Sequence, residues 1–212
     1  MSEIQSINLH MLSEAALRLR ATNRYLEEYA ITQQIVDAES AILQLRKALE
    51  YIAFSSIAPN KKEYELFRAS ADMRTDYKKD YHAGKILQAL GKINEDFYPY
   101  PLLSATHQQN GSFHFDRKTT GYLTKKRFAS TYDRIGKYLH ADNPWSVDKN
   151  FPSFVTEIPS IIHDVFGLIE CHAVFIKTPE FNGVWVVEVL KDGSPPRIIT
   201  GVADGDFFIE KM

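Results

Sequence analysis

One helical stripe constrains this chain more than any other feature of its sequence. Apolar or small residues recur at alternating steps of three and four between positions 35 and 56, namely Ile35, Ala38, Ile42, Leu45, Leu49, Ile52 and Ser56. Because an α-helix turns once every 3.6 residues, these positions share one face over about six turns. The Pro59-Asn60 pair then ends the helix. Such a stripe needs other helices to cover it, so it predicts a helical bundle.

Other segments supply those helices. The spacing of apolar residues and the helix propensities predict helices over 12–29, 61–70, 76–93, 124–141 and within 153–170. On a helical wheel, the segment 124–141 divides into two faces. The apolar face holds Phe128, Thr131, Tyr132, Ile135, Tyr138 and Leu139, and the polar face holds Asp133, Arg134, Lys137 and His140.

Two β features interrupt and follow the helices. Asn110-Gly111 lies between two runs typical of strands, which predicts a β-hairpin over about 102–117 with His107 opposite His114. Short segments rich in Val, Ile and Phe at 172–178, 184–190 and 197–202 predict a small antiparallel meander. We therefore expect a mainly α fold: a four- to five-helix bundle over 1–170, with the inserted hairpin, and a β-rich subdomain over 171–212 packed on it.

Composition excludes several classes of protein. The 212 residues include 25 basic and 27 acidic ones, a formal net charge of −2 that argues against coating nucleic acid by bulk charge. Cys171 is the single cysteine, so the chain forms no internal disulfide and no four-thiolate zinc site, and a reducing cytoplasmic location is expected. No stretch approaches the roughly 20 apolar residues that span a bilayer, so we expect no membrane partner.

Common cofactor motifs are absent from the sequence. It contains no GxxxxGKS/T, GxGxxG, GxSxG or HExxH pattern, so the usual support for ATP phosphotransfer, dinucleotide redox chemistry, α/β-hydrolase or zincin activity is missing. We therefore expect neither a metal nor another cofactor.

The small net charge conceals a local basic block. Residues 116–140 contain seven basic and two acidic residues, net +5, whereas residues 148–212 contain five basic and ten acidic residues, net −5. Basic side chains interleaved with aromatic ones suit a single-stranded backbone and its bases, although a solvated surface is the alternative. The predicted RNA-binding residues are Arg117, Lys118, Lys125, Lys126 and Arg127.

Arg134 and His140 form the candidate catalytic pair. An arginine can hold a phosphate through two hydrogen bonds, and a histidine can transfer a proton near neutral pH. Together they suit cleavage of RNA by its own 2′-hydroxyl, which requires no metal. Residues six apart on an ideal helix lie about 120° apart, so convergence needs the arginine to bend across or the helix to loosen near His140. The alternative is a solvated helix face.

An Arg-x5-His motif, Arg134 to His140, on a late helix of an all-α bundle resembles the HEPN superfamily (higher eukaryotes and prokaryotes nucleotide-binding). The earlier helix containing residues 41–51 is similar to that family's helix with polar residues near the site. The resemblance implies a metal-independent endoribonuclease, or an RNA- or nucleotide-binding protein, with Arg134 and His140 as catalytic residues. It also implies a homodimer in which two motifs face each other, and a role as a toxin or in phage defence, with an antitoxin or defence component as protein partner.

Four further residues are expected to support this pair. Asp133 and Lys137 lie on the same helix face, and Lys137 would engage the RNA backbone. Glu39 or Glu50, on the striped helix, would orient Arg134 or His140; alternatively, Glu50 forms a routine exposed pair with Arg46.

A second function class remains open at this point. The chain could be a non-catalytic interaction module, in which the bundle binds a protein and the acidic tail contributes a complementary surface through Asp204, Asp206 and Glu210.

Overall fold

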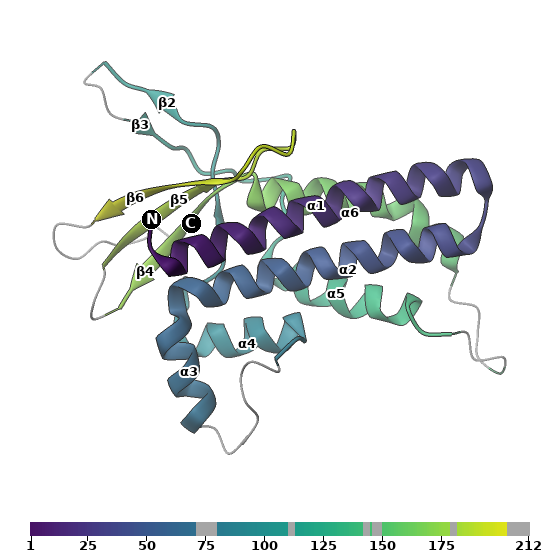
Figure 1. Ribbon diagram of the computed structural model, residues 1–212, viewed down its shortest axis with the longest axis horizontal. Helices are drawn as coiled ribbons and strands as arrows, with labels where there is room; N and C mark the ends of the chain where they lie inside the picture. The colour runs from purple at the N-terminus through teal and green to yellow at the C-terminus, as the bar shows by residue number, and fades with distance from the viewer. Residues whose placement is uncertain (71–79, 110–112, 142–144, 146–149, 179–181, 203–212) are drawn as a thin grey trace.

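Two long antiparallel helices form the spine of the computed structural model (Figure 1). They are α1 (Glu3–Thr32) and α2 (Ile35–Ile57). Gln33 between them adopts a left-handed conformation, with φ of 55°, and its N–H donates to the Tyr29 carbonyl. The structure describes residues 1–70, 80–109, 113–141, 145, 150–178 and 182–202.

Helix α1 begins nine residues before its predicted start. Ser2 caps it: its side chain accepts a hydrogen bond from the Gln5 N–H, while the Gln5 side chain accepts one from the Ser2 N–H. This reciprocal capping satisfies two backbone donors that a helix start otherwise leaves unpaired. The Ser-x-x-Gln spacing was present in the sequence, but the apolar spacing alone did not reveal it.

The stripe on α2 is the centre of the core, as predicted. Ala38, Ile42, Leu45, Leu49, Ile52 and Ser56 are all buried. Ile35 is the exception at 52% exposed, because it occupies the first position of the helix.

The chain then turns through η1 (Ala58–Asn60) into α3 (Lys61–Ser70) and, further on, α4 (Ala83–Ile93). Positions 76–79 of the predicted helix over 76–93 lie outside the described residues, positions 80–82 are not helical, and α4 begins at Ala83. His82 is the N-cap, with its ring nitrogen Nδ1 accepting from the Lys85 N–H at 3.4 Å. Just before it, Asp80 accepts hydrogen bonds from Tyr64 and Arg68 of α3. These bonds hold the start of α4 against α3.

The remaining helices are α5 (Lys125–Tyr138) and α6 (Phe151–Ile169). The helix predicted within 153–170 is present as α6, and its apolar residues Ile158, Ile161, Ile162, Val165 and Ile169 are all buried. Pro159 lies inside α6.

A four-stranded antiparallel sheet lies at one end of the helices (Figure 1). Its strand order is β1 (Tyr100–Pro101), β4 (Cys171–Lys177), β5 (Asn182–Glu188), β6 (Arg197–Val202). The predicted three-strand meander is present, and β1 is the strand that the sequence did not predict. Pro101 is tolerated in β1 because β1 is an edge strand.

The inserted hairpin is present, but its predicted register was wrong. Strand β2 (Thr106–His107) pairs with β3 (Phe113–His114) so that His107 lies opposite Phe113 and Thr106 opposite His114. The connection therefore contains five residues, 108–112, rather than the two of a tight Asn-Gly turn; Asn110 and Gly111 themselves lie outside the described residues. His114 instead contacts Asp116 at 3.2 Å.

Sheet and helices share one hydrophobic core. Val174, Ile176, Trp185, Val187 and Val189 belong to the same buried cluster as the apolar faces of the helices. Among the described residues, no helix combines the length and apolar character needed to cross a membrane.

Candidate functional site on helix α5

Helix α5 lies between two grooves. Phe128, Tyr132 and Ile135 on its inner face are fully buried. One flank faces α6 across a groove of about 500 Å³, and the other faces α4 across a groove of about 430 Å³. The residues predicted for its polar face, Asp133, Arg134, Lys137 and His140, are all exposed, as the helical wheel indicated.

Arg134 is firmly held on the α6 side. Its Nη1 and Nη2 donate to the two carboxylate oxygens of Glu157, each at 2.7 Å. Its guanidinium lies 4.9 Å from the ring centre of Phe154, and it is also hydrogen-bonded to Tyr138. The ion pair raises the pKa of Arg134 and lowers the pKa of Glu157. This two-bond geometry is the one that an arginine offers to any planar or tetrahedral oxyanion.

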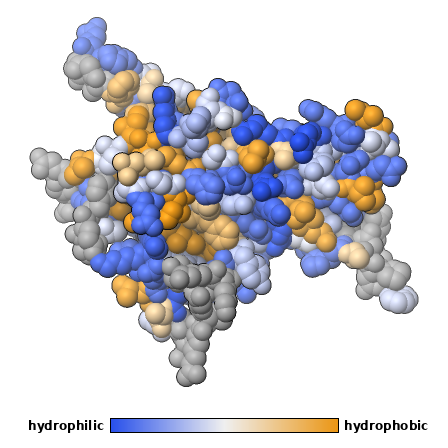
Figure 2. Space-filling view, viewed as in Figure 1, coloured by the Kyte–Doolittle hydropathy of each residue, from blue (hydrophilic) through white to orange (hydrophobic). Residues whose placement is uncertain are grey.

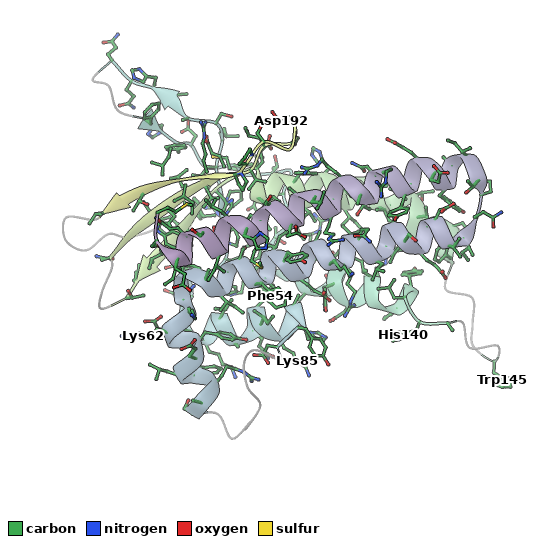
Figure 3. The ribbon with its side chains drawn as sticks, in the orientation of Figure 1. Phe54, Lys62, Lys85, His140, Trp145 and Asp192 are labelled. Atoms are coloured by element: carbon green, nitrogen blue, oxygen red, sulfur yellow. The ribbon has the colours of Figure 1, made fainter. Side chains whose placement is uncertain are left out.

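His140 lies just beyond the end of α5, near the right-hand end of the bundle in Figure 3. The helix ends at Tyr138 with Leu139 as its C-cap, so the ideal helical geometry does not determine the direction of the His140 side chain. Tyr138 stacks on Phe154 of α6 with ring centres 4.0 Å apart and planes 2° apart. That stack fixes the end of α5 from which His140 extends.

A second ion pair closes the other end of the α5–α6 groove. Arg127 contacts Asp164 at 2.6 Å. Arg127 lies seven residues before Arg134 on α5, and Asp164 lies seven residues after Glu157 on α6. Since the two helices are antiparallel there, the pairs form two rungs of a ladder. The groove between them is lined by the hydroxyls of Ser130, Thr131, Thr156 and Ser160. Both arginines of this groove are thus paired with carboxylates of α6.

The predicted supporting glutamates lie elsewhere. Glu50 accepts a hydrogen bond from the Tyr132 hydroxyl at 2.8 Å and contacts Arg46 at 3.2 Å. It therefore orients Tyr132 and Arg46, and the partner of Arg134 is Glu157 instead. Glu39 is exposed near the start of α2. Glu50 does not reach Arg134 because α2 packs on the inner face of α5, whereas Arg134 points to α6.

Arg46, Glu50 and Tyr132 form a polar cluster, whereas the sequence analysis offered Arg46 and Glu50 only as a routine exposed pair. Arg46 donates to the Tyr132 hydroxyl at 2.7 Å, and its guanidinium lies 4.1 Å from the centre of that ring. Gly136 makes room for it, because a Cβ there would lie 2.6 Å from Arg46 Nη1. Burial and the hydrogen bond to Glu50 raise the pKa of the Tyr132 hydroxyl. The cluster joins α2 to α5.

The five predicted RNA-binding residues separate into three environments. Lys118 is 18% exposed and donates to the Gly167 carbonyl at 3.2 Å near the end of α6, beside Glu170. Arg117 is half-buried over the ring of Tyr100. Lys125, Lys126 and Arg127 are exposed on the first turn of α5. Lys118 therefore neutralises the carbonyl end of α6, and the exposed cations are those of α5.

The groove between α4 and α5 was not predicted from the sequence. It is lined by His82, Lys85 and Gln88 from the α4 side and by Lys125 and Asp133 from α5, with Leu87 and Ala129 as apolar walls. His82 approaches Asp133 at 3.9 Å, and its ring contacts Tyr132 edge-on with centres 5.1 Å apart. His82 and Lys85 are far from Asp133 in sequence, so only the antiparallel packing of α4 on α5 reveals the site.

No family model, curated protein or solved structure matches this chain. Among the described residues, no group of three or more His, Cys, Asp or Glu side chains is arranged to hold a metal ion. An arginine positioned for an oxyanion and an exposed histidine beyond it can bind a phosphodiester and transfer protons.

Proposed function

We propose that this protein is a HEPN-type RNA-binding protein that cleaves RNA without a metal, using Arg134 and His140. The observation that carries the proposal is the exposure of both side chains at one end of α5, with the Arg134 guanidinium already presenting two donors to an oxyanion. Lys137, also exposed, lies between them in the sequence and adds positive charge for the RNA backbone.

In the proposed reaction, the RNA attacks itself. His140 accepts the proton of a 2′-hydroxyl, the 2′-oxygen forms a bond to the adjacent phosphorus, and the bond from phosphorus to the 5′-oxygen breaks. The 5′-oxygen takes a proton from His140 of the partner subunit. The products are a 2′,3′-cyclic phosphate and a 5′-hydroxyl, and Arg134 stabilises the charge on the phosphoryl oxygens during the step.

This reaction uses both an acid and a base, whereas each motif offers one imidazole. A homodimer with two-fold symmetry would bring the second histidine to the site. We therefore propose that the active species is a dimer joined near the end of α5.

In the free protein, Glu157 occupies the donors that the phosphate needs. The RNA phosphate must exchange with this carboxylate, which the exposure of both partners permits. The variant Glu157→Gln keeps the size of the side chain but loses its charge, so it should bind RNA several-fold more tightly. The variant Arg134→Ala should lose this binding.

The direct test is cleavage of a single-stranded RNA in the presence of a metal chelator. Wild type should produce a 2′,3′-cyclic phosphate, and His140→Ala should lose the activity by at least about a hundredfold, the usual contribution of a general acid or base. His10→Ala is the matched control, because His10 is an exposed histidine on α1. Equal cleavage by wild type and His140→Ala, or no cleavage by wild type, would refute the catalytic proposal.

The resemblance also suggests the biological setting, a toxin or a phage-defence component held in check by a protein partner. Induced expression of wild type in a bacterial host should then slow growth, and His140→Ala should relieve the effect. Equal growth inhibition by both proteins would rule out toxicity through this site.

A second candidate is a protein-interaction module; the acidic tail residues predicted for it, Asp204, Asp206 and Glu210, lie outside the described residues. It is favoured by an apolar groove of about 460 Å³ between the start of α1, η1 and the sheet, lined by Ile4, Pro59, Ile176 and Trp185 among others. Figure 2 shows apolar surface gathered where α1 begins and α2 ends, and Phe54, labelled in Figure 3, lies there. Under this candidate, Ile4→Asp should prevent binding of an apolar segment of a partner protein. Ile31→Asp, at the far end of α1, should not, and RNA affinity should be unchanged in both.

A further inference from the structure

We propose that the groove between α4 and α5 is a second binding site, one that takes a nucleotide through its terminal phosphate. The site is distinct from the Arg134–His140 pair, because Arg134 faces α6 and the residues of this groove face α4. The same phosphate could belong to a free mononucleotide or to the end of an RNA strand. The experiment below separates these two sources.

Charge favours an anion in this groove. Lys85 and Lys125 contribute two positive charges and Asp133 one negative charge, so the groove carries a net charge of +1 with His82 neutral. On the other flank of the same helix, both arginines of the α5–α6 groove are already paired with carboxylates, Arg127 with Asp164 and Arg134 with Glu157. The volume of about 430 Å³ lies within the roughly 300–1,000 Å³ usual for small-molecule sites.

Gly91 allows Lys125 to line the groove. A Cβ at Gly91 would lie 3.2 Å from Lys125 Nζ, so the bare backbone of α4 lets Lys125 lie across it, with Nζ 4.5 Å from the centre of the Phe97 ring. A Cβ at Gly84 would touch the His82 ring at 3.4 Å. Glycine at position 91 therefore leaves room for the Lys125 side chain at this end of the groove, whereas the distance at Gly84 is an ordinary van der Waals contact.

His82 is oriented as a donor. Because its Nδ1 accepts the Lys85 N–H, a neutral His82 has its proton on Nε2, the atom 3.9 Å from Asp133. The imidazole N–H and the ammonium of Lys85 therefore belong to the same turn of α4, where they can bind two oxygens of one phosphate. Leu87 and Ala129 supply an apolar wall for the sugar or the base.

The test is calorimetric titration of the full chain with uridine 5′-monophosphate, with uridine, and with a short RNA whose 5′ end is or is not phosphorylated. Uridine 5′-monophosphate should bind and uridine should not. The two RNAs are compared in the Arg134→Ala variant, which should lack RNA binding at the other site; there the phosphorylated RNA should bind and the unphosphorylated RNA should not. Lys85→Ala should weaken binding about tenfold, the usual effect of losing a charge-assisted hydrogen bond. His82→Asn, which keeps a good N-cap residue, should also weaken it several-fold. Lys92→Ala is the control, because Lys92 lies on α4 outside the groove.

The outcomes separate this site from the catalytic one. Binding of the mononucleotide identifies a free nucleotide as a ligand, whereas binding of the phosphorylated RNA alone identifies an RNA end; both support the proposal. No binding of any phosphorylated ligand, or equal losses in Lys85→Ala and Lys92→Ala, would overturn it. Arg134→Ala should leave mononucleotide affinity unchanged, so the second site can fail or succeed independently of RNA cleavage.

Discussion

Burial determines the chemistry of two neighbouring residues, Cys171 and His172. His172 is 1% exposed, and its Nδ1 lies 3.0 Å from the Ile169 carbonyl oxygen. Burial disfavours the charged imidazolium and lowers the pKa of His172 to about 4. The neutral ring, with its proton on Nδ1, donates to that carbonyl and joins β4 to the end of α6. His172 is thus structural, in contrast to the exposed His140.

The stability of the protein should therefore depend on pH through His172. Between pH 6.5 and about 4 the unfolded chain binds a proton at this residue and the folded chain does not. The free energy of unfolding should therefore decrease as the pH is lowered through this window, in total by on the order of 3 kcal/mol. Urea unfolding at pH 7.5, 6 and 5 measures this slope. The slope should be smaller in His172→Gln and unchanged in His10→Gln; an unchanged slope in both would contradict the assignment.

Cys171 should be chemically inert in the folded protein. It is 5% exposed, and burial, together with nearby Glu188, raises the pKa of its thiol to about 11. The thiolate that reacts with electrophiles is therefore scarce and shielded at neutral pH. Titration with a disulfide reagent should detect no thiol in the native protein and one thiol in urea. Rapid labelling without denaturant would show that β4 opens readily.

A single methyl group added at Gly167 should strongly destabilise the folded protein. A Cβ there would lie 1.9 Å from the Gly121 carbonyl oxygen, a contact that requires the backbone to move. Gly167→Ala should lower the melting temperature by many degrees despite the better helix propensity of alanine. Gly91→Ala is the comparison, because its nearest neighbour is the mobile end of Lys125. Equal melting temperatures of the two variants would refute this close approach.

At the scale of elements, the helices were easier to predict than the side-chain pairs that form between them. The wheel of α5 correctly separated Phe128, Tyr132 and Ile135 from the exposed residues, because burial follows a local period. The pairs of side chains that meet between two helices do not follow the helical period of either sequence. Nothing local in the sequence indicates that Arg134 meets Glu157 on α6 or that Glu50 meets Tyr132, since these pairs are set by how helices pack.

The start of α4 and the hairpin register show the same limit. Each depends on a few hydrogen bonds that apolar spacing does not indicate, the His82 cap for α4 and the β2–β3 pairing for the hairpin. A shift of one residue in a hairpin places different side chains opposite each other. The hairpin itself could be predicted from its turn residues, but its register could not.

The contact between α2 and α5 allows a sharp test of the Arg46 cluster. A methyl group at Gly136 must displace Arg46 from Tyr132, so Gly136→Ala should destabilise the wild-type protein. In an Arg46→Ala background the same change meets no guanidinium and should stabilise α5 by about 1 kcal/mol, the helix propensity of alanine over glycine. A double-mutant cycle by chemical unfolding measures this reversal. Additive effects of the two changes would mean that Arg46 and Gly136 do not interact.

At the scale of the whole molecule, the sheet and the helices depend on each other. The sequence suggested a helical part over 1–170 and a β-rich part over 171–212, because the residue patterns change there. In the structure, the buried side chains of β4 and β5 enter the same cluster as those of α1, α2 and α6. Composition and local pattern mark a change of secondary structure, but they do not reveal whether a core is shared.

A fragment ending at residue 170 should therefore not fold like the intact chain. Removing Val174, Ile176, Trp185, Val187 and Val189 uncovers the helices that they pack against, and the exposed apolar surface costs roughly 25 cal/mol per Å². The fragment should unfold without a cooperative transition and should bind a hydrophobic dye. As a control, replacing residues 104–115 by Asn-Gly should preserve cooperative unfolding, because Leu103 N and Asp116 O are only 2.8 Å apart and the β2–β3 strands are exposed. Cooperative unfolding of the 1–170 fragment at the temperature of the full chain would mean that the helices are an independent domain and that the sheet is an appendage.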